Sequence, residues 1–325
     1  MKMRGVGIGS AFYGTGYGNG FPDISRCQVE LQKDGKVAVY VGATEVGQGA
    51  KTIMSQMAAE VLGLPLEDII FSCEDTRLTP DAGTAAASRQ TYNTGNAIKK
   101  ACENLRQRLI DVAVAEFKFN SDVGVTMKNG LVYFKTFPSK SITLQEIASK
   151  FVEVPLREEG VFTAQTTKMD EETGQGAPYW PYTFNVYGII LEVDTETGIV
   201  DILKAVCAQD VGRAINPELI EGQMDGGFAM GLGYALMEDL NLQQGQMKHK
   251  RFSNYLIPTA LDIPELEKII IEDPESTAPF GAKGIGEPVM LGVAPAILNA
   301  IYDAVGVRIT EIPVTPQRLL KALKK

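Results

Sequence analysis

The chain has 325 residues, of which 31 are lysine or arginine and 40 are aspartate or glutamate, so its formal net charge is −9. Hydrophobic residues make up 45% and charged residues 22% of the sequence, which is typical of a globular protein and excludes a disordered one. The acidic balance, without any lysine- or arginine-rich run, excludes nucleic acid as a partner, because binding to phosphates needs a clustered basic surface.

The chain offers few side chains for metal binding or covalent catalysis. Its one histidine is His249, and its four cysteines, Cys27, Cys73, Cys102 and Cys207, lie far apart without a CxxC pair. This set cannot form a structural zinc site or an iron–sulfur cluster, and the thin cysteine count is typical of a reducing compartment. We therefore expect a cytoplasmic protein that supplies no metal ligand and relies on carboxylates, backbone groups or a bound cofactor.

Two segments resemble membrane-directing sequences only in part. Residues 1–5 are basic, but no apolar run follows them, so we expect no signal peptide. The apolar segment 289–307 carries one formal charge, Asp303, and also contains Gly292 and Pro295. A buried core helix is therefore predicted there, and no association with a membrane.

Hydrophobic periodicity and turn residues predict alternating strands and helices in the first half of the chain. Residues 27–32 and 36–41 form a predicted hairpin around Asp34-Gly35, and the loop 42–49 leads into a helix that begins at Ala50. The next predicted elements are a strand at 69–73, a long helix after the loop 79–88, a hairpin around Asn129-Gly130 and a short helix opened by Thr143 and Glu146 as a capping box.

Residues 155–181 are irregular and polar, and they form the predicted connection between lobes at 1–154 and 182–325, which need not be continuous. The later predicted elements are strands at 187–193 and 199–205, a glycine-rich helix opened by Asn216-Pro217, the core helix from Pro288 and a last helix from Thr315-Pro316. Several glycines inside one helix indicate close approach to a neighbour or a ligand. The alternation predicts an α+β (mixed α/β) fold, with two lobes of sheet plus helices.

The first of three candidate ligand-binding loops is 42–49, between a predicted strand and a predicted helix. Its small residues would let backbone N–H groups approach an anion at the helix N-terminus. It has neither the Gly-Lys-Ser/Thr ending of a P-loop nor a GxGxxG turn, so a tight structural turn is the alternative.

The second candidate loop, 85–91, has side chains small enough for its backbone to contact a large ligand. Ser88, Gln90 and Thr91 add hydrogen-bonding groups. The alternative interpretation is an ordinary helix start with Ser88 as its cap.

The third candidate loop, 280–288, contains Glu287, the only acidic residue from Ser276 through Tyr302. Burial among glycines and aliphatic residues would disfavour its ionised form, whereas the N-terminus of the following helix would favour it. Such a balance suits a general base near neutral pH. A helix-capping carboxylate is the alternative.

Taken together, GATEVGQG at 42–49, TAAASRQT at 84–91, DVGRAINP at 210–217 and GIGEP at 284–288 resemble the motifs of the molybdenum hydroxylases, the xanthine dehydrogenase and aldehyde oxidase family. They follow that family's order and spacing. The resemblance covers only the second, C-terminal half of the family's molybdopterin-binding part, so residues 1–325 are expected to form that half. The division looks most like the medium molybdopterin subunits of the nicotinate dehydrogenase type.

The resemblance implies a molybdenum–molybdopterin cofactor, in the cytosine dinucleotide form, and a role for each matched position. Glu287 matches the family's catalytic glutamate, the base of a hydroxylation that uses oxygen derived from water. The positions that match cofactor-binding residues are Gly47, Gln48, Gly49, Ala86, Ala87, Ser88, Gln90, Thr91 and Gly286. Tyr13 and Tyr17 fall near a substrate-sandwiching aromatic residue of the relatives, and Met230 stands where many relatives have a glutamine.

The resemblance also implies a multi-subunit oxidoreductase that is active only with a large molybdopterin subunit, an iron–sulfur subunit and an FAD subunit. Iron–sulfur clusters and FAD are accordingly expected on partner chains. The implied reaction is hydroxylation of an N-heterocyclic aromatic compound such as nicotinate, with oxygen, sulfur or selenium as the terminal ligand on molybdenum. The alternatives are a hydroxylase of aldehydes or purines and a non-catalytic assembly partner of the cofactor subunit.

Overall fold

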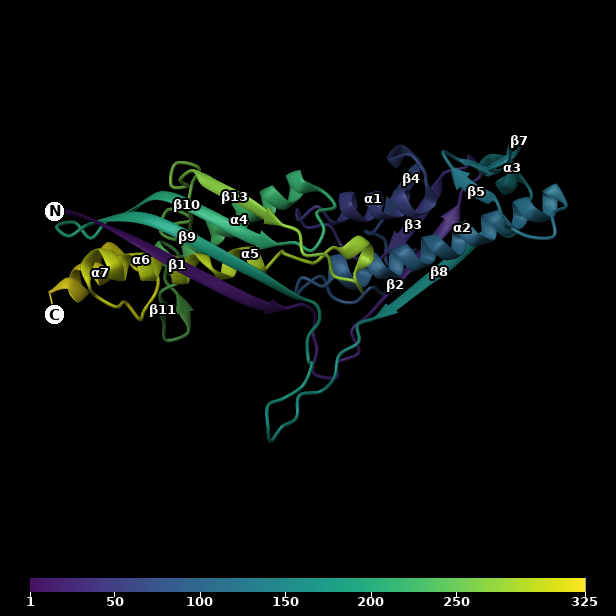
Figure 1. Cartoon of the computed structure of the whole chain (residues 1–325). Coiled ribbons are helices and arrows are strands. Elements are labelled where there is room, and N and C mark those ends of the chain that lie inside the picture. The colour runs from purple at the N-terminus through teal and green to yellow at the C-terminus, as the bar shows by residue number, and fades with distance from the viewer. Residues whose placement is uncertain (325) are drawn as a thin grey trace. The chain divides into compact units, whose positions relative to one another are not determined.

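The computed structural model describes residues 1–324. The chain forms two compact units, each assembled from segments that are distant in the sequence (Figure 1). Unit 1 contains Met1–Gly14, Tyr182–Asp273 and the residues from Ile285 onward, and unit 2 contains Thr15–Pro181 and Pro274–Gly284.

Unit 1 is built on a four-stranded sheet in the order β1-β9-β10-β13, with helices against one face (Figure 1). β9 is antiparallel to both β1 and β10, and β13 is parallel to β10. The elements of unit 1 are β1 (Lys2–Gly14), β9 (Tyr182–Asp194), β10 (Val200–Asp210), α4 (Pro217–Leu236), β11 (Leu242–Gln243), β12 (Gln246–Met247), β13 (Leu266–Ile271), α5 (Pro288–Leu291), α6 (Val293–Val305) and α7 (Pro316–Leu323).

The glycine-rich start of the sequence is a packing requirement of this sheet. Gly5, Gly7 and Gly9 alternate along β1 and face α6, where a Cβ would lie 2.0, 2.1 and 2.2 Å from backbone oxygens of α6 and the turn before it. Real Cβ atoms do not approach so closely, so a larger residue at any of the three would push the helix off the strand.

Close helix packing also explains two glycines of α4. A Cβ on Gly227 would lie 2.5 Å from the side chain of Val289, and one on Gly231 would lie 2.5 Å from that of Val293. The close approach that the glycine content predicts is therefore, at these two positions, an approach to the neighbouring helices α5 and α6.

The apolar segment Pro288–Val305 is long and apolar enough to cross a membrane when judged by length and composition alone. In the structure 56% of it is buried, and it breaks at Gly292 between α5 and α6. Ile297 and Ile301 of α6 are completely buried in the core of unit 1. This packing is that of a core helix, as predicted.

Unit 2 contains a four-stranded sheet in the order β4-β3-β2-β8 and a three-stranded sheet, β5-β6-β7 (Figure 1). The helices α1 and α2 pack against the larger sheet, and their inner residues share one hydrophobic core with it. The elements of unit 2 are β2 (Ile24–Leu31), β3 (Val37–Val41), α1 (Ala50–Leu62), a 3-10 turn (Leu66–Asp68), β4 (Ile69–Ser72), a π-helical turn (Gln90–Thr94), α2 (Gly95–Phe117), β5 (Val125–Lys128), β6 (Leu131–Phe134), β7 (Phe137–Thr143), α3 (Leu144–Ser149), β8 (Arg157–Thr163) and a second 3-10 turn (Pro279–Gly281).

The predicted hairpins, helices and caps are confirmed where local signals are strong. β2 pairs with β3, and β5 pairs with β6, each in antiparallel register. Thr143 and Glu146 form a complete capping box, and the side chain of Asn216 accepts a hydrogen bond from the N–H of Leu219 (3.1 Å) at the start of α4. The mixed α/β fold class is confirmed as well.

The structure differs from the sequence-based organisation in two respects. Residues 157–163, expected to be irregular, form β8, which pairs with β2 and is packed so closely on α2 that a Cβ on Gly160 would lie 2.0 Å from the carbonyl oxygen of Ala97. Met1–Gly14, assigned to the first lobe, pairs along its length from Lys2 with β9 of unit 1. Both differences arise from strand pairing between segments far apart in sequence, which local patterns do not encode.

Candidate functional site

Two of the three candidate loops contact each other in unit 2. We call residues 42–49 the glutamine loop and residues 84–91 the alanine loop. The Nε2 group of Gln48 donates a hydrogen bond to Oε1 of Gln90 (2.9 Å), and Nε2 of Gln90 lies 3.4 Å from the carbonyl oxygen of Thr44. Two side chains predicted to bind the cofactor are thus hydrogen-bonded to each other.

The side-chain amide of Gln48 is held by its own loop. Its Oε1 accepts a hydrogen bond from the N–H of Val46 (2.8 Å), and its Nε2 donates a second hydrogen bond to the carbonyl oxygen of Thr44 (3.0 Å). Both N–H bonds of Nε2 therefore point to acceptors within unit 2. A ligand at this loop would meet Gln48 through the remaining lone pair of Oε1, or would replace one of these bonds.

The helix N-terminus behind the glutamine loop is occupied by the loop's own carboxylate. Glu45 accepts hydrogen bonds from the N–H groups of Gly47 (2.7 Å), Gly49 (3.0 Å) and Lys51 (2.9 Å). Burial acts to raise the pKa of Glu45, but the backbone hydrogen bonds outweigh it and hold that pKa below its ordinary value. These N–H groups are therefore not the open anion cradle that the glycine pattern suggested, because Glu45 already satisfies them.

The alanine loop has an unusual backbone. Ala87 and Ser88 have φ angles of 56° and 50°, which lie in the left-handed region that residues other than glycine rarely adopt. Ala86 is exposed, Ala87 and Ser88 are half-buried, and the loop continues into the π-helical turn that contains Gln90 and Thr91. Ser88 is not the cap of that turn, since Arg89 occupies the position before it. The alternative of an ordinary Ser-capped helix start is therefore wrong.

Two backbone contacts hold the left-handed residues. The carbonyl oxygen of Ala87 accepts a hydrogen bond from the N–H of Gly16 (3.0 Å). The carbonyl group of Ser88 lies against Gly284, where a Cβ would come within 1.8 Å of its oxygen. Gly284, the first residue of the third candidate motif, GIGEP, therefore packs directly on the alanine loop. Strained backbone of this kind persists only where its surroundings fix it.

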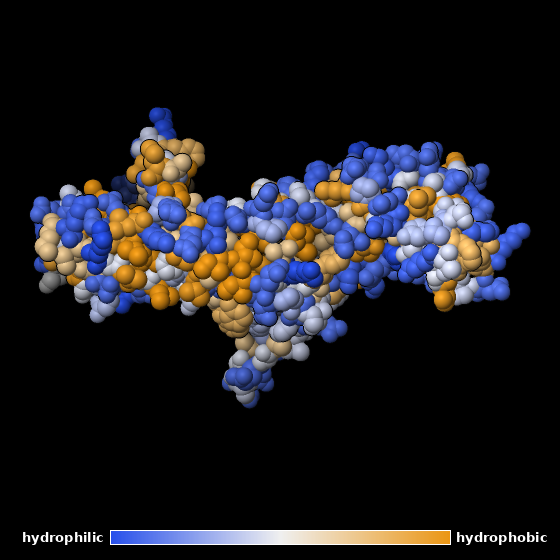
Figure 2. Space-filling model, turned by 45° about the horizontal axis from the view of Figure 1, so that its top comes forward, coloured by the Kyte–Doolittle hydropathy of each residue, from blue (hydrophilic) through white to orange (hydrophobic). Residues whose placement is uncertain are grey.

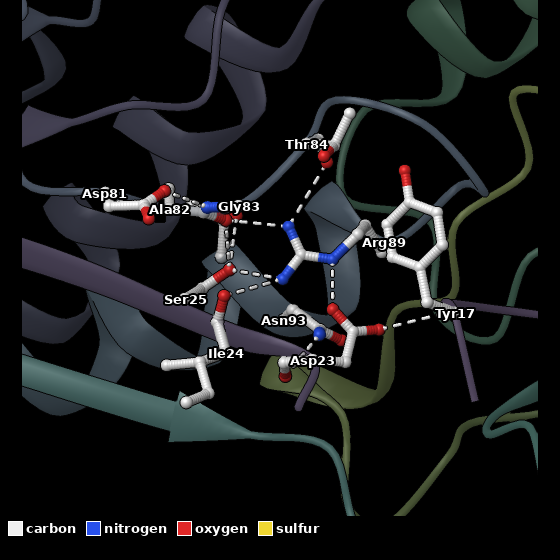
Figure 3. A network of polar contacts seen from close by, with 11 residues as sticks. Tyr17, Asp23, Ile24, Ser25, Asp81, Ala82, Gly83, Thr84, Arg89 and Asn93 are labelled. Atoms are coloured by element: carbon white, nitrogen blue, oxygen red, sulfur yellow. Dashed lines mark hydrogen bonds and ion pairs between the residues drawn. The ribbon is translucent and has the colours of Figure 1, made fainter. Parts of the chain in front are cut away.

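A buried arginine anchors the alanine loop from the inside (Figure 3). Arg89 is 1% exposed and forms an ion pair with Asp23, which is 3% exposed. The guanidinium donates further hydrogen bonds to the carbonyl oxygens of Ala82 (2.7 Å), Ile24 (2.9 Å) and Thr84 (3.2 Å) and to Oγ of Ser25 (3.0 Å). A buried charge is stable only with this degree of pairing and hydrogen bonding.

The sequence analysis missed both members of this pair. Asp23 and Arg89 are 66 positions apart, and no local pattern connects them. The available signal was an arginine inside a run of small uncharged residues, where a buried charge requires a distant acid. Asp23 also orders its surroundings, because its Oδ2 accepts a hydrogen bond from the N–H of Tyr17 (3.1 Å) and its carbonyl oxygen accepts one from Nδ2 of Asn93 (3.1 Å).

Glu287, the predicted base, belongs to unit 1 and directly precedes α5. It is half-buried, and its backbone carbonyl accepts a hydrogen bond from the N–H of Met290 (3.0 Å). Its carboxylate makes no capping hydrogen bond to α5. The alternative interpretation of Glu287 as a helix-capping carboxylate requires such a hydrogen bond and is therefore not supported. Gly286, the adjacent predicted cofactor contact, is exposed.

The two tyrosines proposed to contact substrate lie in different units. Tyr13 is opposite Thr183 near the end of β1, whereas Tyr17 belongs to unit 2, where its ring centroid lies 5.4 Å from that of Phe21. Tyr17 and Phe21 line a cavity of about 580 Å³. Met230, the position at which the resemblance leads us to expect a glutamine in many relatives, is 53% exposed on α4.

Side chains that could bind a metal ion do not gather in either unit. Across residues 1–324, no group of three or more histidine, cysteine, aspartate or glutamate side chains could hold one. All four cysteines are buried and free of disulfides, and Cys207 packs in the core of unit 1 as a small hydrophobic residue. The distinctive chemistry of unit 2 therefore consists of side-chain amides and a tightly held backbone loop.

Comparison with known proteins shows the family to which the chain belongs. Residues 1–264 match the family model of the molybdopterin cofactor-binding domain. The chain belongs to this family. A putative xanthine dehydrogenase molybdenum-binding subunit of Escherichia coli is 34% identical over 323 residues, which cover 97% of this chain and 41% of that protein. An aldehyde oxidoreductase of Megalodesulfovibrio gigas is 33% identical over 326 residues, which cover 99% of this chain and 32% of that protein.

The molybdopterin-binding fold is shared with solved structures. Quinoline 2-oxidoreductase of Pseudomonas putida matches with a TM-score of 0.84 and 26% identity, over 100% of this chain and 42% of that one. The resemblance to the xanthine dehydrogenase and aldehyde oxidase family is thus confirmed. This molybdopterin-binding chain spans less than half the length of the relatives described here.

The alanine loop fits the organic part of such a cofactor. Exposed Ala86 has no side chain beyond Cβ, and exposed Gly47 has no atom within 4 Å of the position where its Cβ would lie. A planar ring system can therefore lie against the backbone at these positions. The amide of Gln48, next to Gly47 in the glutamine loop, offers a pterin ring the remaining lone pair of its Oε1, because both N–H groups of its Nε2 are already bonded within unit 2.

Proposed function

We propose that this chain is the medium molybdopterin-binding subunit of a cytoplasmic, multi-subunit molybdenum hydroxylase. The observation that carries the proposal is the alanine loop, whose strained backbone is held by buried Arg89 and by Gly284 while Ala86 stays exposed. Backbone strain of this kind is concentrated at ligand-binding and catalytic sites. Membership of the molybdopterin cofactor-binding family names the ligand class that such a loop would serve.

The proposed complex also contains a large molybdopterin subunit, an iron–sulfur subunit and an FAD subunit. The support is that a sequence relative is described as the molybdenum-binding subunit of a xanthine dehydrogenase, so it is one subunit of a larger assembly. The four cysteines, all buried, provide no cluster for iron–sulfur ligation among residues 1–324. We propose the cytosine dinucleotide form of the molybdenum cofactor.

The proposed substrate is an N-heterocyclic aromatic compound, with nicotinate as the first candidate and a relationship to nicotinate dehydrogenases. A structural relative described as a quinoline 2-oxidoreductase supports this class. Purines and aldehydes are the alternatives, since sequence relatives are described as a xanthine dehydrogenase subunit and an aldehyde oxidoreductase.

In the proposed mechanism, the bound molybdenum cofactor supplies the oxidation of the substrate carbon with oxygen from water. Ala86, Ala87 and Ser88 hold the pterin by backbone contact, and Gln48 and Gln90 orient it by hydrogen bonds. Glu287 is the base, and it accepts on a carboxylate oxygen the proton that the water releases.

The proposal is tested on the native complex, purified through an affinity tag on this chain. We expect molybdenum and a cytosine nucleotide in amounts equimolar with the chain, together with hydroxylation of nicotinate or another N-heterocycle in a substrate screen. A complex without molybdenum or pterin would refute the proposal and favour the non-catalytic assembly partner. Turnover restricted to aldehydes or purines would retain the subunit assignment and replace the substrate.

A further inference from the structure

The buried face of β9 changes from apolar to polar along its length. The apolar part ends at Ile189, which is completely buried in the core of unit 1. The next three inward positions carry polar groups and are at most 1% exposed; they are Tyr187, Asn185 and Thr183. Burial of a polar group is unfavourable unless the group is hydrogen-bonded, so this part of the core depends on the partners that these side chains find.

The outer face of the same stretch is hydrophobic. Phe184 and Val186 alternate with the buried polar residues and are 52% and 43% exposed. Figure 2 shows hydrophobic residues on the surface of the left-hand part of the molecule, where Figure 1 places β9. Residues 183–187 therefore reverse the usual pattern of a strand with one buried face, which is apolar inside and polar outside. Natural proteins break such patterns mainly at functional sites.

The polar group of Tyr187 contacts the helix that follows the proposed base. Its hydroxyl donates a hydrogen bond to the carbonyl oxygen of Val289 (2.7 Å), which belongs to α5. Burial raises the pKa of Tyr187, so the hydroxyl keeps its proton and acts as the donor. α5 has only four residues, and the carbonyl groups at the end of a helix have no partner within it. Tyr187 thus supplies a hydrogen bond that the short helix cannot provide for itself.

α5 is also held by packing on two sides. A Cβ on Gly227 of α4 would lie 2.9 Å from the carbonyl oxygen of Val289. At the break that follows α5, a Cβ on Gly292 would lie 2.6 Å from Oδ1 of Asn185. The amide of Asn185 is fixed in turn, because its Nδ2 donates a hydrogen bond to Oε1 of Gln209 (2.9 Å). Contacts this close leave α5 little room to shift while Tyr187 holds it.

We infer that Tyr187 is a positioning residue for Glu287, whose carboxylate it places by fixing the backbone of α5. The inference rests on the proposed function, in which Glu287 is the base. Glu287 lies two positions before Val289, and the ring of Pro288 between them fixes its own φ angle. The N–H of Met290 donates to the carbonyl oxygen of Glu287 (3.0 Å), so a shift of α5 would move Glu287 with it. A misplacement of about 1 Å can cost about a hundredfold in rate.

The test is Tyr187→Phe in the native complex purified through this chain, since phenylalanine keeps the ring and removes only the hydroxyl. Steady-state turnover is measured with nicotinate, or with xanthine or benzaldehyde if the complex oxidises one of these instead. We expect kcat to fall about tenfold while KM changes less than about twofold, because a misplaced base slows the chemical step without weakening substrate binding.

Two further measurements separate positioning from general support of the fold. Hydrogen–deuterium exchange of the backbone amides of residues 285–292 should become about tenfold faster in Tyr187→Phe, and this measurement needs no turnover. In a chain that already carries Glu287→Gln, Tyr187→Phe should cause no further loss of turnover, because it acts through that carboxylate. The matched control is Tyr255→Phe, which removes a hydrogen bond to Glu238 elsewhere in unit 1 and should leave kcat unchanged.

Unchanged kcat in Tyr187→Phe would overturn the inference. A further loss of turnover in the double variant, or failure of the Tyr187→Phe complex to assemble, would overturn it as well, since either result indicates a general role in the fold. Normal turnover in Glu287→Gln alone would refute the proposed base instead, and the exchange rates would still decide whether Tyr187 holds α5.

Discussion

Gly284 lies so close to Ser88 that a Cβ on the glycine would come within 1.8 Å of the serine's carbonyl oxygen. Ser88 has a left-handed backbone with φ of 50°, and its neighbour Ala87 shares that conformation. Two motifs far apart in the sequence thus depend on each other through one packing contact. The contact fixes the part of the alanine loop that is proposed to hold the cofactor.

We predict that Gly284→Ala destabilises the chain by about 1–3 kcal/mol, because the added methyl group forces the alanine loop to move. The same movement should lower the molybdenum content of the native complex. Urea denaturation of the isolated chain and metal analysis of the complex measure the two effects.

Gly222→Ala is the matched control. Gly222 lies in α4 with no atom within 4 Å of the position of its Cβ, so alanine should be neutral or should stabilise by about 0.5–1 kcal/mol. Equal behaviour of the two alanine variants would contradict the packing argument.

We expect substitutions of Arg89 and Asp23 to have strongly coupled effects on the free energy of unfolding. Arg89→Met leaves the Asp23 carboxylate buried without its partner, and we expect a loss of about 3–5 kcal/mol in the free energy of unfolding. Adding Asp23→Leu removes the orphaned charge and should restore part of that loss. A double-mutant cycle by urea denaturation measures the coupling, and strictly additive effects would contradict a structural ion pair.

Local signals in the sequence predict the elements of the fold but not their assembly. Gly63 ends α1 in a left-handed conformation, and Thr143 with Glu146 starts α3, because caps and turns act over a few residues. The pairing of β1 with β9 and the ion pair of Asp23 with Arg89 join distant segments. Neither hydrophobic periodicity nor motif spacing in the sequence predicts such contacts.

In the candidate site too, the local features could be predicted from the sequence and the contacts between side chains could not. Its loops and the position of Glu287 could be found from small residues and an isolated carboxylate. That Gln48 bonds to Gln90, and that Glu45 occupies the N–H groups of the glutamine loop, depends on side-chain directions that a sequence does not give.

The hydrogen bonds of Glu45 predict an acid-dependent contribution to stability. The folded-state pKa of Glu45 lies below its ordinary value of 4.5, so the ionised form is favoured in the folded chain. That stabilisation is complete above the unfolded-state pKa and is lost as the pH falls through the folded-state value. The unfolding temperature of Glu45→Gln should therefore approach that of the unchanged chain in acid, and a gap that widens there would contradict this account.

Gln48 and Gln90 should also be coupled, though more weakly. We expect the Gln48→Ala, Gln90→Ala cycle to give a coupling of about 0.5–1.5 kcal/mol, the usual value of one side-chain hydrogen bond. Either single variant should release cofactor from the native complex more readily during dialysis. A coupling of zero would show that the two loops are held by other contacts.

The central claim is that Glu287 acts as the base of a molybdenum hydroxylase, and Glu287→Gln in the purified native complex tests it most directly. The amide keeps the size of the side chain but cannot accept the proton. We predict that turnover falls at least about 100-fold while molybdenum content and the unfolding temperature stay unchanged. Near-normal turnover in that variant, with the complex fully loaded, would contradict the account.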